Sequence, residues 1–231
     1  INGKKVLKKN PSIEIKIGSS ESMSKSKKNT IDPQKIIDDY GADAVRLFIL
    51  SDSPPEKDVQ WSEEGMISSH KFIQKLWTLN MMIQDEINKN HSKDDNNELS
   101  KFTNRFIKKV TEALNNFNYN VIIAYMHELY SFLFKLIKNK YKKQTLISNY
   151  HKILIVIMPV VPHLSNECIK LLNNKGEVKW PTIDEKFLIE DYTNIVVQIN
   201  GKKRGLLKTE KNINEDKILE IIKKDKNMLK Y

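Results

Sequence analysis

The sequence predicts a mainly α-helical protein that ends in a small α+β unit, and three observations lead to this fold class. From Ser62 to about Leu172, apolar residues recur at the three- and four-residue spacing of amphipathic helices. Proline, glycine and asparagine residues divide this stretch into segments of ordinary helix length. After Trp180, two extended runs flank an Asn-Gly pair, which is the pattern of a β-hairpin.

Residues 1–60 are predicted to form the first structural unit, which opens with a strand and a loop. Ile13, Ile15 and Ile17 alternate with polar residues, as they would on one face of a strand. Residues 21–30 then form a polar loop rich in serine and lysine.

Two short helices are predicted after this loop. Asp32 is suited to cap a helix and Pro33 to occupy its first position, so a helix is expected over residues 33–40. It stops at a glycine, and residues 42–50 form the second helix, which the Pro54-Pro55 pair ends.

Residues 61–180 are predicted to form a bundle of four or five antiparallel helices joined by short loops. Ser62, followed by two glutamates, caps a first helix that reaches about Asn88. The polar segment 91–98 separates it from a second helix, which has a basic side opposite an apolar face. The apolar face comprises Phe102, Phe106, Val110, Ala113, Leu114 and Phe117.

The remaining helices of the bundle are more apolar. Residues 121–137 are apolar nearly all round, which predicts the central helix of the bundle. A further helix covers about residues 146–158, and Pro159 and Pro162 separate it from a short one that reaches Leu172.

Residues 190–231 are predicted to begin a C-terminal α+β domain. Strands at 195–199 and 204–209 flank the Asn200-Gly201 turn, and residues 214–224 form an amphipathic helix. Three basic residues project from the hairpin tip, and a solvated turn would also explain their charge. They are Lys202, Lys203 and Arg204.

The composition describes a strongly basic protein. Among 231 residues, 39 are Lys or Arg and 29 are Asp or Glu, giving a formal net charge of +10. Such a surplus favours a polyanionic partner such as nucleic acid, although a generally lysine-rich protein would also show it. The single cysteine, Cys168, excludes an intrachain disulfide and predicts a core thiol and a cytoplasmic location. The longest apolar run, 153–161, is too short to span a bilayer, so no membrane partner is expected.

The segment Met23-Ser24-Lys25-Ser26 carries the clearest chemical pattern, because it places a cation among small residues in a loop. A lysine there can reach a triphosphate and neutralise the charge that develops as pyrophosphate leaves. Serine hydroxyls and backbone N–H groups add further donors to phosphate oxygens. Composition alone, however, favours an ordinary solvated loop.

Four phrases of the sequence resemble the leucyl-tRNA synthetases, a family within the class I aminoacyl-tRNA synthetases. The loop is similar to the class I motif usually read Lys-Met-Ser-Lys-Ser, and here it continues through Lys27-Lys28-Asn29 to Ile31-Asp32-Pro33. The other phrases follow in the family's order. They are Tyr40–Leu47, Ser53–Asp58 with Trp61–Gly65, and Val196–Gly205.

The resemblance assigns roles to the residues of the loop. It implies that Lys25 stabilises the ATP phosphates during adenylate formation and is the catalytic residue of this chain. Ser22 stands where the family has its first lysine, which leaves Lys27 or Lys28 as a substitute. The ATP-binding residues implied are Met23, Ser24, Lys25 and Ser26.

The activity that the resemblance implies is that of a leucine–tRNA ligase. Such an enzyme activates leucine with ATP, which magnesium accompanies, and transfers the leucine to leucine tRNA. The basic hairpin tip would contact the tRNA phosphate backbone, the protein would be monomeric, and no resident metal site is expected because the five histidines lack ligand spacing. The chain starts at Ile1 and lacks the leucine pocket and editing domain, so it is expected to be a C-terminal piece that is inactive alone.

Two alternatives stay open at this stage. A non-catalytic RNA-binding helical module would also combine a bundle with a basic appendage. Isoleucyl- or valyl-tRNA synthetases resemble the chain too, but they tend to carry Leu-Gly in place of Lys27-Lys28.

Four further residues invite a functional interpretation. Trp61 is expected to pack the connecting unit against the bundle, and Trp77 is expected to lie in the core. His163 follows a proline and is given a packing and hydrogen-bonding role. For Arg46, a structural salt bridge and a tRNA contact are equally consistent with the sequence.

Overall fold

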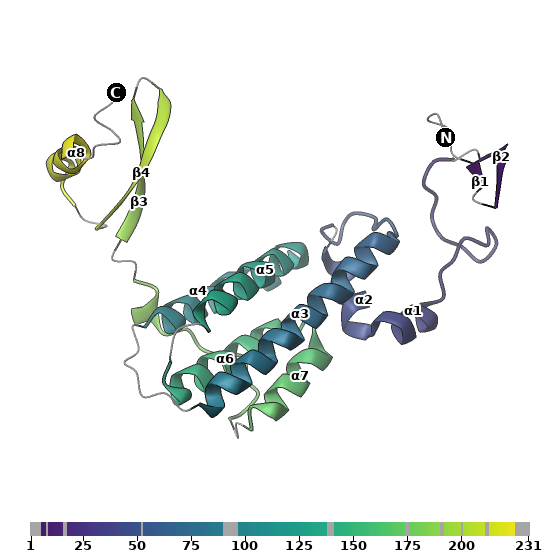
Figure 1. Ribbon diagram of the computed structural model, residues 1–231, viewed down its shortest axis with the longest axis horizontal. Coiled ribbons are helices and arrows are strands. Elements are labelled where there is room, and N and C mark those ends of the chain that lie inside the picture. The colour runs from purple at the N-terminus through teal and green to yellow at the C-terminus, as the bar shows by residue number, and fades with distance from the viewer. Residues whose placement is uncertain are drawn as a thin grey trace.

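The computed structural model describes residues 6–7, 9–15, 18–51, 53–89, 97–137, 141–173, 176–189, 192–199, 201–210 and 213–224. Figure 1 shows a helical body from which two arms project, one near each end of the chain. The first arm carries an antiparallel hairpin of β1 (Val6–Leu7) and β2 (Asn10–Glu14). The other carries the antiparallel pair β3 (Tyr192–Ile199) and β4 (Lys202–Glu210), followed by α8 (Glu215–Lys224). The predicted mainly α-helical fold class is therefore confirmed.

The helical body contains seven helices. They are α1 (Pro33–Tyr40), α2 (Ala42–Ser51), α3 (Glu63–Asn88), α4 (Glu98–Asn115), α5 (Tyr119–Leu136), α6 (Lys143–Ile157) and α7 (Pro162–Leu171). Helices α3 to α7 surround one apolar core, which Leu47 of α2 joins. A second, smaller cluster of Ala44, Phe48 and Met66 packs α2 on the start of α3. Within the described residues, no helix is both long and apolar enough to cross a membrane.

The helix starts that the sequence predicts are confirmed by their capping bonds. The Asp32 carboxylate accepts from the Gln34 N–H at 3.0 Å at the start of α1. The Ser62 hydroxyl accepts from the Gly65 N–H at 3.1 Å at the start of α3. Each bond satisfies a first-turn donor that has no partner within its own helix.

The most enclosed helix is α6, not the predicted one at 121–137. Nine of the 15 residues of α6 are buried, against six of the 18 in α5. Helix α6 contacts α3, α4 and α7, whereas one side of α5 faces solvent. The sequence of α5 looks as apolar as that of a buried helix because aromatic residues such as Phe134 lie on its exposed side.

Three other expectations are corrected. Trp77 is 39% exposed on α3 rather than part of the core. Phe117 is 61% exposed with φ of 55°, because it lies in the turn after α4 and not on that helix's apolar face. The N-terminal strand ends at Glu14, so it includes Ile13 but not Ile15; both side chains are exposed, and Ile17 lies outside the described residues.

Helix α2 is fastened to the junction between α6 and α7 by two charged side chains. Asp43 is buried and accepts from the backbone N–H groups of His163 at 3.3 Å and Leu164 at 2.7 Å, in the first turn of α7. Its carboxylate also contacts His163 Nδ1 at 2.8 Å. Arg46 donates to the carbonyls of Pro159 at 2.7 Å and Val160 at 3.2 Å, just after α6. An anion thus meets the positive end of one helix and a cation the negative end of the other.

This junction shows structural contacts of two residues that the sequence singled out. His163 has the hydrogen-bonding role that was expected of it. For Arg46, of the two roles left open, the structure shows a structural one, although the guanidinium bonds two main-chain carbonyls rather than a carboxylate. Trp61 packs edge-to-face on Phe48 with ring centroids 5.3 Å apart, which agrees with its predicted packing role.

Candidate functional site

The loop at residues 21–30 lies between the first hairpin and α1, on one of the two arms (Figure 1). Residues 25–28 form a turn, in which the Lys28 N–H donates to the Lys25 carbonyl at 3.2 Å. Lys28 has φ of 54°, in the left-handed region. The turn directs Lys25 and its neighbours toward solvent, where all are at least partly exposed.

The Asn29 side chain links the two ends of the loop through hydrogen bonds to its backbone. Its amide oxygen accepts from the Ser24 N–H at 2.8 Å, and its amide nitrogen donates to the Ser22 carbonyl at 3.3 Å. The Ser24 hydroxyl accepts from the Lys27 N–H at 3.3 Å and lies 3.2 Å from the Ser26 hydroxyl. Ser24 and Ser26, both predicted site residues, are thus brought together beside Lys25.

The three lysines of the loop differ in their charge partners. Lys27 forms an ion pair with Glu21 at 2.9 Å, with both side chains at least half exposed. Within the described part of the chain, the ammonium groups of Lys25 and Lys28 have no ion-pair partner. Lys28 is therefore better suited than Lys27 to take over the role of the family's first lysine.

Such a loop can bind an anion but does not enclose one. It offers two unpaired cations and two neighbouring hydroxyls, all suited to phosphate oxygens. Met23 is 48% exposed, so it does not anchor the loop in a core. The sequence did not indicate the bonding roles of Asn29 and Glu21, although an asparagine in a serine-rich loop is a common source of side-chain bonds to the backbone.

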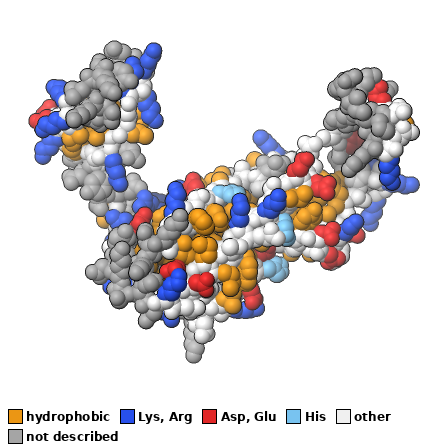
Figure 2. Space-filling model, in the orientation of Figure 1, with side chains coloured by type: hydrophobic (Ala, Val, Ile, Leu, Met, Phe, Trp, Pro, Cys, Tyr) orange, Lys and Arg blue, Asp and Glu red, His pale blue; other side chains and the backbone are white. Residues whose placement is uncertain are grey.

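The second predicted site is the basic tip of the β3–β4 hairpin. Gly201 has φ of 73° in the turn, and Ile199 pairs with Lys202 across it. The register shifts between Val197 and Gln198, so Gln198 pairs with Lys203 while Val197 pairs with Gly205. Arg204 is the extra residue of this bulge, and it is partly buried while Lys202 and Lys203 are exposed. Figure 2 shows Lys and Arg side chains gathered on this arm.

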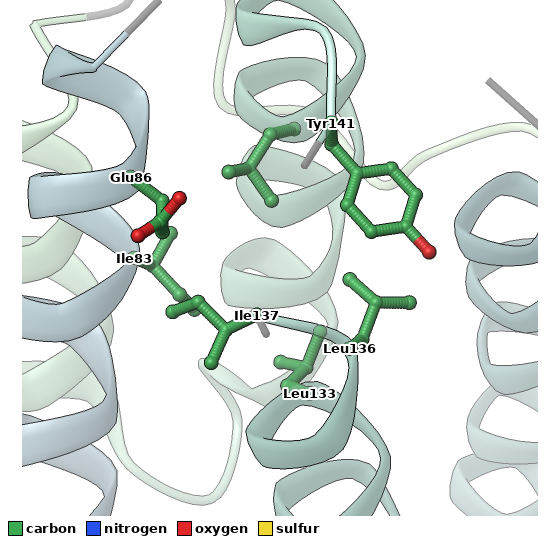
Figure 3. A pocket seen from close by; sticks show the side chains of 7 residues that line it. Ile83, Glu86, Leu133, Leu136, Ile137 and Tyr141 are labelled. Carbon is green, nitrogen blue, oxygen red and sulfur yellow. The ribbon is translucent and has the colours of Figure 1, made fainter. Parts of the chain in front are cut away.

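The pocket at the end of α3 and α5 is too small for a ligand. Its volume is about 10 Å³, close to the space of one water molecule. Figure 3 shows its wall of Ile83, Leu133, Leu136 and Ile137, with the Glu86 carboxylate and Tyr141 at its sides. No cluster of three His, Cys, Asp or Glu side chains that could bind a metal occurs among the residues for which the structure gives positions.

Two family models match the chain over the regions just described. The anticodon-binding domain of tRNA ligase matches residues 96–222, which is more than half of the chain. The chain belongs to this family. A second model, tRNA synthetases class I (I, L, M and V), matches residues 15–62 and so includes the loop with Lys25.

Several sequence relatives of this chain are leucine–tRNA ligases. That of Zymomonas mobilis is 37% identical over 206 residues, which cover 88% of this chain and 23% of the relative. That of Orientia tsutsugamushi is 40% identical over 200 residues, covering 83% of this chain and 23% of the relative. The chain thus spans about a quarter of the length of the curated relatives it matches.

A solved structure has the same fold. The agnB2 LeuRS of Agrobacterium radiobacter K84, in a ternary complex described as LeuRS-tRNA-LeuAMS, superposes with a TM-score of 0.76. The two sequences are 23% identical, and the match covers 90% of this chain and 28% of that one.

Proposed function

We propose that this chain is part of a leucine–tRNA ligase, which activates leucine with ATP and transfers it to leucine tRNA. The observation that carries the proposal is the loop at Met23–Ser26, with its unpaired Lys25, inside the segment that matches class I tRNA synthetases. Relatives at 36–40% identity over most of the chain support leucine as the amino acid.

Lys25 acts on the triphosphate in this proposal. When leucine attacks the α-phosphate of magnesium-bound ATP, negative charge accumulates on the departing pyrophosphate. An ammonium group held at those oxygens stabilises the transition state more than the ground state, which is what accelerates the step. Lys28 is the second cation, while the hydroxyls of Ser24 and Ser26 donate to phosphate oxygens.

The rest of the chain binds tRNA in the same proposal. Lys202, Lys203 and Arg204 contact the phosphate backbone from the hairpin tip, which positions the tRNA without reading its sequence. The net charge of +10 adds long-range attraction to the polyanion. We also propose that the whole protein is a monomer of the cytoplasm. The boundaries 1–60, 61–180 and 190–231 remain a predicted division into domains.

The test of the loop assignment compares two lysine substitutions in the whole protein. Lys25→Ala is expected to slow leucyl-adenylate formation by about 10²–10³-fold, as for loss of a group that stabilises developing charge. Lys27→Ala is the matched control, because its ammonium is already paired with Glu21, and it is expected to change the rate by a few-fold at most. Single-turnover rates would separate this step from tRNA charging. Equal rates for the wild type and Lys25→Ala would remove Lys25 from the mechanism.

A further inference from the structure

A polar pocket between α4 and α6 has no role in the function proposed so far. Its volume is about 390 Å³, within the range of pockets that hold small ligands. The two helices lie side by side in the body (Figure 1). Phe187, in the short 3₁₀ helix at Glu185–Phe187, also lines the pocket. Eight of its nine lining residues carry polar side chains, and none of the nine is acidic.

The floor of this pocket consists of buried polar side chains. Ser100, Asn104 and Asn149 are 8%, 2% and 6% exposed, respectively. The Asn149 amide nitrogen donates to the Ser100 hydroxyl at 3.3 Å and to the Thr145 carbonyl at 2.9 Å. Its amide oxygen has no donor among the described residues, so it is left to accept a bond from a ligand.

The floor is held in place by the segment that leads to the hairpin. Asn104 donates to the Ser100 carbonyl at 2.8 Å and accepts from the Asp184 N–H at 2.8 Å. Trp180 Nε1 donates to the Thr111 hydroxyl at 3.0 Å, so residues 180–187 follow α4. Because its own polar groups are fixed in this way, the pocket is formed before a ligand arrives.

The rim supplies three different groups. The Phe187 ring is half-buried, with the Lys186 ammonium 4.8 Å from its centroid. Lys152 lines the side that belongs to α6, and the Gln144 amide at the start of α6 is exposed and has no partner among the described residues. An aromatic ring, an amide with both a donor and an acceptor, and a cation together match the base face, the base edge and the phosphate of a nucleotide.

We propose that this pocket binds one unpaired nucleotide of the bound tRNA. The base lies against Phe187, its edge pairs with Gln144 and with the Asn149 oxygen, and its phosphate meets Lys152. The free acceptor on Asn149 can bond the amino or ring N–H donor that each of the four bases carries on its pairing edge. The inference rests on tRNA being the partner, as proposed above, and it adds a base contact to the phosphate contacts of the hairpin, which starts five residues after Phe187.

The first arm of the test uses free nucleotides and does not depend on tRNA. The chain, labelled with ¹⁵N, is titrated with AMP, GMP, CMP and UMP while the side-chain amide signals of Gln144 and Asn149 are followed by NMR. At least one nucleotide is expected to shift both signals, and Phe187→Ala is expected to abolish the shift. Absence of any shift with all four nucleotides would overturn the inference, whether or not tRNA binds.

The second arm measures affinity for leucine tRNA. Phe187→Ala is expected to weaken binding roughly tenfold with an unchanged salt dependence, as for loss of one stacked base. Lys152→Met is expected to lower the slope of log affinity against log salt by about one unit, as for loss of one phosphate contact. Phe134→Ala removes an exposed aromatic ring from α5, away from the pocket, and is the control, expected to leave affinity unchanged.

The outcomes separate the pocket from the ligase proposal. If the wild type binds leucine tRNA and Phe187→Ala binds as tightly as Phe134→Ala, the pocket takes no tRNA nucleotide and the inference fails alone. If a free nucleotide shifts the signals but Phe187→Ala leaves tRNA affinity unchanged, the pocket binds free nucleotides and not a nucleotide of tRNA. That result also contradicts the inference. If the wild type does not bind tRNA at all, the proposed function fails with it, while the NMR result still reports on nucleotide binding.

Discussion

The buried carboxylate of Asp43 offers a direct test of how α2, and with it the arm that carries the loop, is held on the bundle. Asp43→Ala removes the acceptor for two N–H groups in the first turn of α7. The N–H of buried Leu164 would be left without a partner, at a cost of about 1–3 kcal/mol. Losing the capping contact to His163, whose side chain is exposed, adds about 1 kcal/mol.

The expected destabilisation by Asp43→Ala is therefore about 2–4 kcal/mol. In a protein of this length it lowers the melting temperature by roughly 5–15 °C. Asp43→Asn keeps an acceptor but loses the charge, so it is expected to cost about 1 kcal/mol. Thermal and urea unfolding followed by far-ultraviolet circular dichroism would measure both. Asp39→Ala, an exposed site on α1, is the matched control and is expected within about 0.5 kcal/mol of wild type. If Asp43→Ala unfolds like Asp39→Ala, the capping argument is wrong.

Three further predictions concern other parts of the bundle. Gly65→Ala places a Cβ 2.8 Å from Phe48 Cε2. Despite the better helix propensity of alanine, it is expected to destabilise the protein by about 1–2 kcal/mol in urea unfolding. A gain in stability would show that the Phe48 ring moves aside freely. Burial raises the pKa of the Cys168 thiol to about 12, so the native protein is expected to resist thiol-reactive dyes from pH 7 to 9 and to react only when unfolded; rapid native labelling would contradict this. Burial, with a smaller effect of Lys75, lowers the pKa of His127 below 6.5, so NMR is expected to show it titrating below that value. Because the folded state disfavours the protonated ring, the contribution of His127 to stability is present above pH 6.5 and falls as the pH drops; titration above 6.5 would refute it.

The helix boundaries could be predicted because their signals are local. Asp32 and Ser62 cap helices through bonds to residues two or three positions away, and Gly41 ends α1 with φ of 84°. The Asn200-Gly201 pair marked the hairpin turn in the same way, although Asn200 itself lies outside the described residues.

Burial was harder to predict because it depends on which neighbour covers a helix. Leu76 and Trp77 are adjacent on α3 and both apolar, yet Leu76 faces the core and Trp77 lies on the flank, 100° away around the helix. For α5 and α6, a similar apolar sequence leads to different burial: each contacts three helices, but one side of α5 still faces solvent.

Features formed by one continuous segment could be predicted, whereas features formed by distant segments could not. The loop lysines and serines form a continuous motif, so their positions could be read directly. The Asp43–Leu164 bond joins residues 121 positions apart, and the pocket at Asn149 combines α4, α6 and residues near 187. No spacing in the sequence indicates contacts of that range.

Affinity for tRNA tests most directly whether this chain is a tRNA-binding part of a leucine–tRNA ligase, as we propose. Binding of the purified chain to leucine tRNA would be compared with binding to isoleucine and valine tRNAs at two salt concentrations. We predict tighter binding to leucine tRNA, with a preference that persists at the higher salt. Equal binding to all three that disappears with salt would reflect only counterion release by a chain of charge +10, and it would contradict the claim.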